Sequence, residues 1–151
     1  MQISTIVDSD LDGCAIVYAE AFSKGPWFEK WSERKAFERL SNLFHAPGFV
    51  GLKALENNEI IGLAIGNIEP FTPKDIFYFR DLCVSPTYQK SGVGGALIDN
   101  LHDILRIENI ERSYLITLRG SAMIPYLSNR GYKFDSNQCI MTFTLGANHI
   151  E

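Results

Sequence analysis

Three glycines and a lysine follow directly on an apolar run in the stretch YQKSGVGGAL, residues 88–97. Glycine allows backbone N–H groups to approach a ligand without a Cβ in the way. A helix that begins here would add unpaired N–H groups and the positive end of its dipole, and both favour anions. The stretch therefore predicts a phosphate-binding turn, with a flexible turn that serves only packing as the alternative.

Two common phosphate-binding motifs do not fit this spacing. A dinucleotide-binding GxGxxG would need a third glycine where the chain has Leu97. A P-loop GxxxxGK[ST] would need a Lys-Ser or Lys-Thr pair, which does not follow Gly92. The pattern that remains is Gln89-x-x-Gly92-x-Gly94.

The strands that would position this turn are predicted from β-branched and aromatic runs bounded by glycine, proline or asparagine. The segment before the turn, IFYFRDLCV, is one of these runs, and ENNE at 56–59 indicates a hairpin between two others. The predicted strands are 2–7, 49–55, 60–69, 76–84, 113–118, 132–134 and 139–145.

Helices are predicted where apolar residues recur at helical spacing after a capping residue. Asp8 or Ser9 caps the first, and Ser32 caps the second. Two more are predicted at 92–106 and 121–129, the latter followed by Gly131 at the C′ position. The order β-α-α-β-β-β-α-β-α-β-β indicates a mixed α/β fold with a central mixed sheet flanked by helices.

Composition limits the classes of function. The chain has 151 residues, 46% apolar and 21% charged, which predicts one globular domain over 1–151. A net charge of −4 argues against nucleic acid as the main partner. No apolar run is long enough to span a bilayer, and the N-terminus lacks a signal-peptide pattern, so we expect a cytoplasmic protein without a membrane partner. Cysteine and histidine spacing gives no metal site.

The segment RDLCVSPTYQKSGVGGALI, residues 80–98, resembles the acetyl-CoA motif of the GNAT superfamily of N-acetyltransferases. That motif is [RQ]-x-x-G-x-[GA], after a strand that often ends like ED-[LI]-Y-V-x-P. The order of elements is also similar, so the resemblance covers nearly the whole chain. The stretch FSKGPWFEKWSERKAFERL with PGFVGL further resembles a bacterial subgroup of unassigned substrate.

The resemblance implies acetyl-CoA as cosubstrate and assigns residues to it. The pyrophosphate site consists of Gln89, Lys90, Ser91, Gly92, Val93, Gly94 and Gly95. The backbone of Leu82, Cys83 and Val84 pairs with the pantetheine arm, and a backbone N–H near Leu82 or Cys83 polarises the acetyl carbonyl. Thr117 borders the same gap, between the fourth and fifth family strands.

Asp81 matches the acidic position of the family pattern. An alkylamine titrates near the lysine value of about 10.4, so it must lose a proton before it attacks a thioester. A carboxylate can accept that proton directly or through water. The alternative is that Asp81 pairs with Arg80, Lys74 or an N-terminal amide and only holds the strand.

The family often has a tyrosine that acts as acid toward the thiolate. The matching position here is Leu127, and Tyr126 lies one place early, which is about 100° of helix rotation. Tyr126 is therefore the candidate acid, with core packing as the alternative.

The loop GPWFEKW is the predicted acceptor contact. Its aromatic side chains can stack on a cation that its carboxylate attracts, or they can staple the second helix. These residues are Trp27, Phe28, Glu29 and Trp31. Cys83 stands where the family usually has tyrosine, and its side chain points either into the acceptor gap or into the core.

The predicted function is direct acetyl transfer from acetyl-CoA to a primary amine of a small cationic molecule, such as a polyamine or an aminoglycoside. One alternative is acetylation of a peptide N-terminus or lysine. Another is a GNAT-fold sensor that binds acetyl-CoA or CoA without turnover. Such folds often pair, so a homodimer is one expectation, and the oligomeric state is left open.

Overall fold

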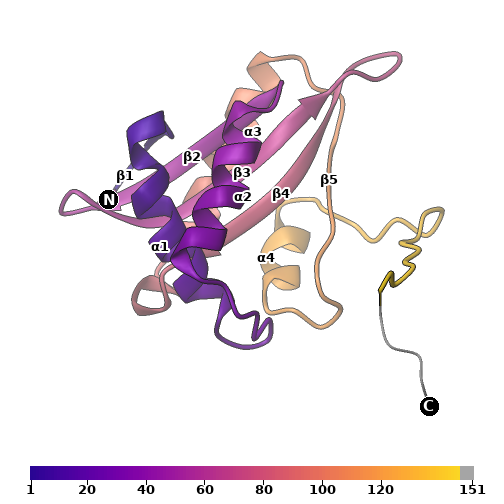
Figure 1. Cartoon of the computed structure of the whole chain (residues 1–151). Coiled ribbons are helices and arrows are strands. Elements are labelled where there is room, and N and C mark those ends of the chain that lie inside the picture. Colours follow the sequence, from indigo (N-terminus) through magenta and orange to yellow (C-terminus); the bar gives the residue numbers. More distant parts are fainter. Residues whose placement is uncertain (147–151) are drawn as a thin grey trace. The chain divides into compact units, whose positions relative to one another are not determined.

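The computed structural model describes residues 1–146, which form two compact units. The first spans Met1–Arg119 and the second begins at Gly120. Elements follow one another as Figure 1 shows. The strands are β1 (Gln2–Thr5), β2 (Phe49–Glu56), β3 (Glu59–Glu69), β4 (Ile76–Val84) and β5 (Ser113–Leu115). The helices are α1 (Leu11–Phe22), α2 (Glu33–His45), α3 (Val93–Ile107) and α4 (Met123–Asn129), with short 3₁₀ turns η1 (Asp8–Asp10) and η2 (Pro86–Tyr88).

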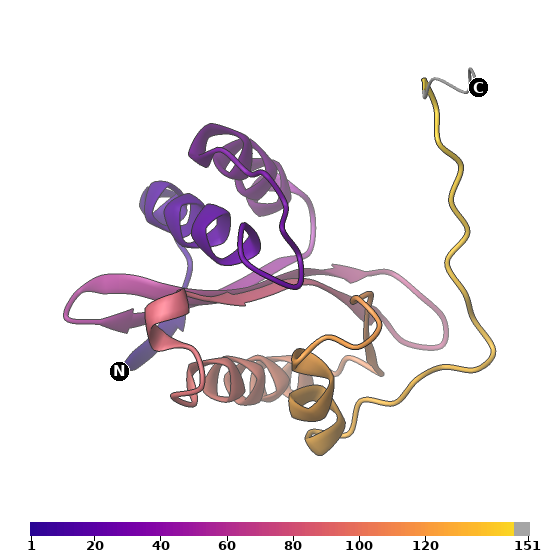
Figure 2. The same ribbon diagram turned by 90° about the horizontal axis from the view of Figure 1, so that it is seen from below.

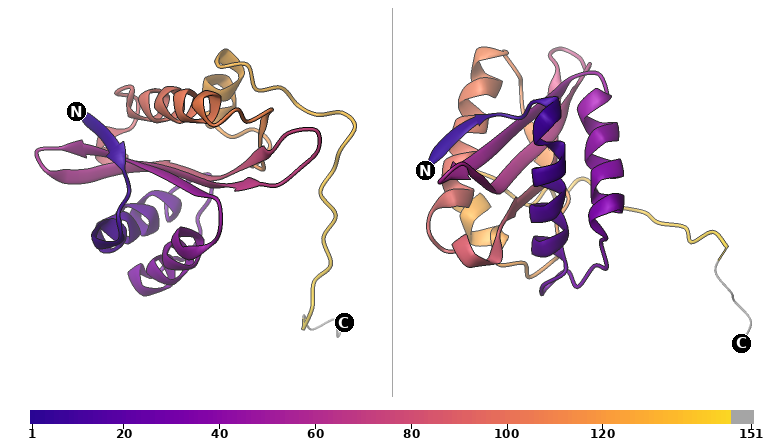
Figure 3. Two further views of the ribbon diagram at one scale, coloured as in Figure 1. Left: turned by 90° about the horizontal axis from the view of Figure 1, so that it is seen from above. Right: turned by 60° about the vertical axis from the view of Figure 1, so that its left-hand side comes forward.

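The five strands form one sheet in the order β1-β2-β3-β4-β5. The first four are antiparallel neighbours, and β5 is parallel to β4. Figures 2 and 3 show α1 and α2 on one face of this sheet and α3 on the other. The first unit is therefore a mixed sheet between helices, which confirms the predicted fold class.

Local sequence signals explain several boundaries. The Ser32 hydroxyl accepts a hydrogen bond from Lys35 N–H at 3.0 Å, as expected of an N-cap residue. Asn57 and Asn58 have φ values of 51° and 64°, which suits the tight turn between β2 and β3. Gly131 has φ 94° just after α4, as predicted.

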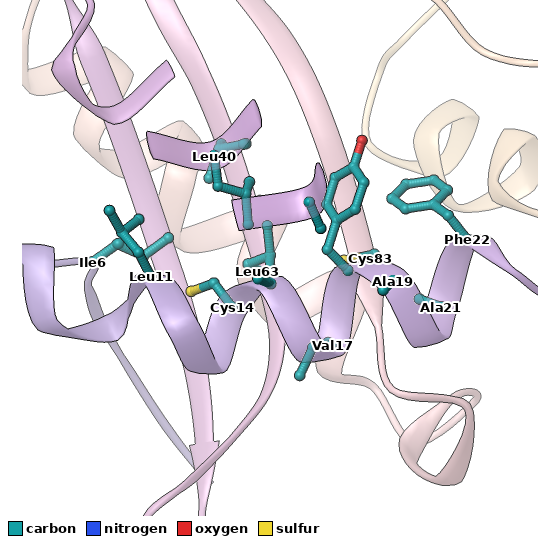
Figure 4. Close-up of a cluster of buried hydrophobic side chains, with 14 residues drawn as sticks. Ile6, Leu11, Cys14, Val17, Ala19, Ala21, Phe22, Leu40, Leu63 and Cys83 are labelled. Atoms are coloured by element: carbon teal, nitrogen blue, oxygen red, sulfur yellow. The ribbon is translucent and has the colours of Figure 1, made fainter. Parts of the chain in front are cut away.

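The main core lies between the sheet and the α1/α2 layer. Figure 4 shows α1 contributing Leu11, Cys14 and Phe22 to it, with Leu40 and Cys83 among the other members. Cys83 is only 6% exposed, so its side chain points into this core rather than into an acceptor gap.

Three predicted strands differ from the structure. The segment predicted at 113–118 forms a strand only as far as Leu115. No strand forms at 132–134 or 139–145, within the described residues of the second unit. β-branched and aromatic composition shows that a segment suits a pleated surface, but a neighbouring strand must supply the hydrogen bonds, and none pairs with these residues.

No helix in residues 1–146 is both long and apolar enough to cross a membrane.

The prediction of one domain over the whole chain stays a prediction.

Candidate active site

A β-bulge in β4 places Asp81. Phe79 lies opposite Gly66 and Asp81 lies opposite Ile65, so Arg80 is the extra residue on β4. Bulges re-aim side chains and are frequent beside active sites. Here the bulge also marks the end of pairing with β5, which runs beside β4 only from Phe77 to Phe79.

The Asp81 carboxylate is held by two helices. Its Oδ2 accepts hydrogen bonds from Arg39 Nε at 3.1 Å and from Arg39 Nη2 at 3.0 Å. The Tyr18 hydroxyl lowers the pKa of the same carboxylate. Arg39 is on α2 and Tyr18 is on α1, so side chains from both helices act on the carboxylate from the same face of the sheet.

The protonation equilibrium of Asp81 reflects competing effects. Burial raises its pKa above the ordinary carboxylate value, since the Asp81 side chain is only 11% exposed. Arg39, through its charge and its hydrogen bond, lowers this pKa, and Tyr18 lowers it as well. These effects do not fully offset burial, and the negative charge of Glu29 raises the pKa again. The net upward pKa shift makes Asp81 a stronger proton acceptor than an exposed aspartate.

The loop between α1 and α2 contributes aromatic and acidic side chains beside Tyr18. The Trp31 ring meets the Tyr18 ring edge-on at 5.1 Å between centroids. Trp31 Nε1–H donates to Glu29 Oε1 at 2.8 Å. Glu29 thus has a fixed position from which its charge acts on both Tyr18 and Asp81.

The other two aromatic residues of this loop differ in exposure. Trp27 packs on Phe22 with ring centroids 5.4 Å apart, and it adjoins the core together with Trp31. Phe28 is 73% exposed and has φ 49°. The two tryptophans thus pack against the protein, in line with the alternative that this loop serves packing. Phe28 and Glu29 are exposed and open to a ligand.

Beyond the bulge, the edge of β4 has backbone groups available. Ser85 N–H donates to Ile61 O on β3 at 2.7 Å. Alternate residues of an antiparallel strand direct their backbone groups to opposite sides, so Leu82 and Val84 direct theirs away from β3. Because β5 no longer pairs there, the Leu82 N–H and C=O face an open edge.

The turn after β4 is tied back to the strand. The Gln89 side chain donates from Nε2 to Val84 O at 3.1 Å, and the Ser91 hydroxyl donates to Tyr88 O. Lys90 has φ 65° and Gly92 has φ 90°, which curls the backbone immediately before α3. Gln89 therefore shapes the turn through its side chain.

The N-terminus of α3 has no side-chain cap. Gly92 is the N-cap residue, and its carbonyl oxygen accepts a hydrogen bond from Ala96 N–H at 3.1 Å. The N–H groups of Val93, Gly94 and Gly95 precede that bond and are the free donors of the first turn. A Cβ on Gly92 would meet nothing within 4 Å, and a Cβ on Gly94 would meet only Val84 Cγ2 at 3.8 Å, so there is room beside these two residues.

Two predicted site residues belong neither to β4 nor to the start of α3. Thr117 is half-buried and follows the end of β5, two residues after Leu115, instead of lying within a strand. Tyr126 lies on α4 in the second unit and is 37% exposed, whereas Leu127 is 6% exposed. Leu127, not Tyr126, is therefore the buried residue of the pair, and both roles considered for Tyr126 stay predictions.

Sequence reasoning missed the two partners of Asp81. Tyr18 has the helical spacing of the core residues of α1, so its hydroxyl gave no separate signal. Arg39 is one of several charged residues in ERKAFERL, and it lies 42 positions from Asp81 in the chain. The predicted partners were Arg80 and Lys74, but Lys74 Nζ donates to Asn109 Oδ1 instead.

The profile of the acetyltransferase (GNAT) family matches residues 16–132, which is more than half of the chain. The protein therefore belongs to the GNAT family of acetyltransferases, as the sequence resemblance predicted. No curated protein sequence shows significant similarity to the chain.

Solved structures share the fold at low sequence identity. An aminoglycoside acetyltransferase from an uncultured soil metagenomic sample, in complex with trehalose, has 18% identity and a TM-score of 0.75, covering 95% of each chain. An aminoglycoside 6′-N-acetyltransferase from Acinetobacter haemolyticus has 14% identity and a TM-score of 0.69, covering 98% of this chain and 100% of that one. A Trypanosoma brucei acetyltransferase has 19% identity and a TM-score of 0.68, covering 94% and 99%.

Proposed function

We propose that the protein is an acetyl-CoA-dependent N-acetyltransferase that transfers acetyl directly to a primary amine of a small molecule. One observation carries the proposal: the buried carboxylate of Asp81 lies at the bulge where the edge of β4 opens, and the same strand leads into the uncapped, glycine-rich start of α3. A proton acceptor, an open strand edge and an anion-binding turn therefore follow one another within 81–95.

The residues of the turn fit the pyrophosphate of CoA. The donors are the N–H groups of Val93, Gly94 and Gly95, and Lys90 adds a positive charge beside them. The space over Gly92 and Gly94 admits phosphate oxygens without a clash with a Cβ. In this proposal Leu82 and Val84 contact the pantetheine arm through backbone groups, while the backbone groups of Cys83 face β3 and do not.

The bound thioester supplies the acetyl group, and the protein supplies orientation and proton transfer. Leu82 N–H, on the open edge, donates to the acetyl carbonyl oxygen and stabilises the negative charge that develops there. The ionised Asp81 carboxylate takes the proton from the amine, directly or through one water. The amine nitrogen bonds to the acetyl carbon, the C–S bond of the thioester breaks, and CoA leaves as its thiolate. Arg39 and Tyr18 hold the carboxylate in place during that transfer.

The amine approaches from the α1/α2 face, where Asp81 and Glu29 combine two carboxylates with the rings of Tyr18 and Trp31. Negative charge and aromatic rings both favour a cationic amine. A peptide N-terminus or a lysine side chain is the alternative acceptor.

Substitution of Asp81 by Asn tests the proton-acceptor role. The amide keeps the shape of the side chain but does not take up the proton, so we expect kcat/KM for the amine to fall about 10²–10⁴-fold. The measurement is release of CoA thiol with a panel of small amines, alongside the affinity for acetyl-CoA, which we expect to be unchanged.

The matched control is Asp99→Asn, on the exposed surface of α3, which should leave both quantities unchanged. A wild-type rate in Asp81→Asn would contradict the role of Asp81. Binding of acetyl-CoA without release of thiol for any amine would instead favour the sensor, which the buried Leu127 at the tyrosine position of the family also favours.

A further inference from the structure

Three side chains at the bulge of β4 form a stack, which we call the Arg80 stack: Arg80, Tyr78 and Tyr114. The Arg80 guanidinium carbon lies 4.2 Å from the centroid of the Tyr78 ring. The Tyr78 and Tyr114 rings are stacked, with centroids 4.7 Å apart and an interplanar angle of 15°. The Tyr114 hydroxyl donates to Glu69 Oε1 at 2.9 Å. The guanidinium is thus supported by two rings from neighbouring strands.

The stack lies on the same face of the sheet as Asp81. Asp81 is opposite Ile65 on β3, and Tyr78 is opposite Asn67. Residues two apart on a strand point to the same side, and Ile65 belongs to the core under α1 and α2. Tyr78, and with it the guanidinium above its ring, is therefore on the α1/α2 face, from which the amine approaches Asp81.

The positive charge of Arg80 has no counter-ion within the described chain. Its Nε is buried and has no hydrogen-bond partner. The neighbouring carboxylate of Asp81 pairs with Arg39, and the carboxylate of Glu69 accepts from Tyr114. A buried N–H without an acceptor is costly, so the arrangement suits a ligand that supplies one.

We infer that Arg80 binds a carboxylate of the acceptor, so that the substrate is a small amino acid. The planar fork of a guanidinium matches a carboxylate in a bidentate pair. Arg80 and Asp81 are consecutive on β4 and lie on the same face of the sheet, so one small molecule can present its carboxylate to Arg80 and its amine to Asp81. Polyamines and aminoglycosides lack that carboxylate and would be repelled by Arg80.

This inference rests on the proposed function for the identity of the reacting amine, but its test does not require turnover. The N-acetyl derivatives of glycine and of the L-amino acids that have a primary α-amine represent the product, and each is compared with its C-terminal amide. Binding is measured by calorimetry, with CoA present and without it. We expect at least one acid to bind the wild-type protein at least 10-fold more tightly than its amide.

The variant Arg80→Met should weaken binding of that acid at least 10-fold and leave binding of the amide unchanged. Arg80→Lys keeps the charge without the fork, and it should lose part of the affinity; it also serves if the methionine variant does not fold. The control is Arg112→Met, because Arg112 also lies over an aromatic ring, that of Phe71 at 5.8 Å, and carries no part of the site.

Three results would overturn the inference: no acid binds, each acid binds no better than its amide, or Arg80→Met weakens acid and amide alike. The last result would mean that Arg80 supports the fold or the cofactor instead of the acceptor. Failure of the proposed function would give a different result. The protein would not bind acetyl-CoA, or would release no thiol, while the difference in affinity between acid and amide would persist.

Discussion

At the scale of single residues, the decisive feature is the arrangement around Asp81. The carboxylate is buried beneath α1 and α2, and three groups act on it from different elements: Arg39, Tyr18 and Glu29. Of these, Arg39 bonds directly to the carboxylate. Arg39 is itself 35% exposed, so its charge compensates the carboxylate without closing the site to solvent.

The pH dependence of the reaction follows from this arrangement. Burial raises the pKa of Asp81, and the charge of Arg39 lowers it. Arg39→Met removes that charge, so we expect the pKa of Asp81 to rise further. Asp81 accepts a proton only when it is ionised, so the acid limb of kcat/KM against pH should move to higher pH. Tyr18→Phe should move the limb in the same direction, because it removes a hydroxyl that lowers the pKa of Asp81.

Two comparisons make this prediction specific. Arg39→Lys retains the charge and should keep more of the wild-type profile than the methionine variant. Arg34→Met removes an exposed charge from the same helix and should leave the acid limb in place. A limb that moves to lower pH in Arg39→Met, or that moves equally in Arg34→Met, would show that Asp81 is not the titrating group.

At the scale of elements, the bulge in β4 does most of the positioning. It reverses which backbone groups face β5, so that Leu82 presents its N–H to the open edge. It also carries Arg80 and Asp81 side by side. The run IFYFRDLCV has no glycine or proline to indicate a bulge, so the sequence predicted the strand and not its irregularity.

Helix α2 matters because it carries Arg39, and its start depends on Ser32. The Ser32→Ala variant loses the bond to Lys35 N–H, so we expect the free energy of unfolding to fall by about 1 kcal/mol. Chemical denaturation measures the change, with the denaturant dependence expected to stay the same. Ser41→Ala, within the same helix, should not destabilise the protein, because alanine has the higher helix propensity. Equal losses in both variants would argue against the cap.

At the scale of the whole molecule, local signals in the sequence predicted most of the first unit. The hairpin asparagines, the Ser32 cap and the glycines before α3 each act within a few residues, and the structure has the corresponding elements. The Asp81–Arg39 pair and the Arg80 stack depend on contacts between distant segments, which composition and spacing do not encode. The two terminal strands were predicted from composition alone, and the described residues there have no strand partner.

The proposed function depends on binding of acetyl-CoA at the start of α3, which a calorimetric titration measures. Gly94 is the residue to change, because Gly92 has φ 90° and any side chain there would be strained. A side chain on Gly94 has room, and a carboxylate in the first turn of a helix is favourable for stability. It would nevertheless repel a pyrophosphate.

We therefore predict that the wild-type protein and Gly94→Ala bind acetyl-CoA with micromolar affinity, and that Gly94→Glu loses at least about 10-fold in affinity, or 1.4 kcal/mol, with no loss of thermal stability. NAD and ATP should not bind in any of the three. Equal affinity in Gly94→Glu and Gly94→Ala, or no binding to the wild-type protein, would contradict the account.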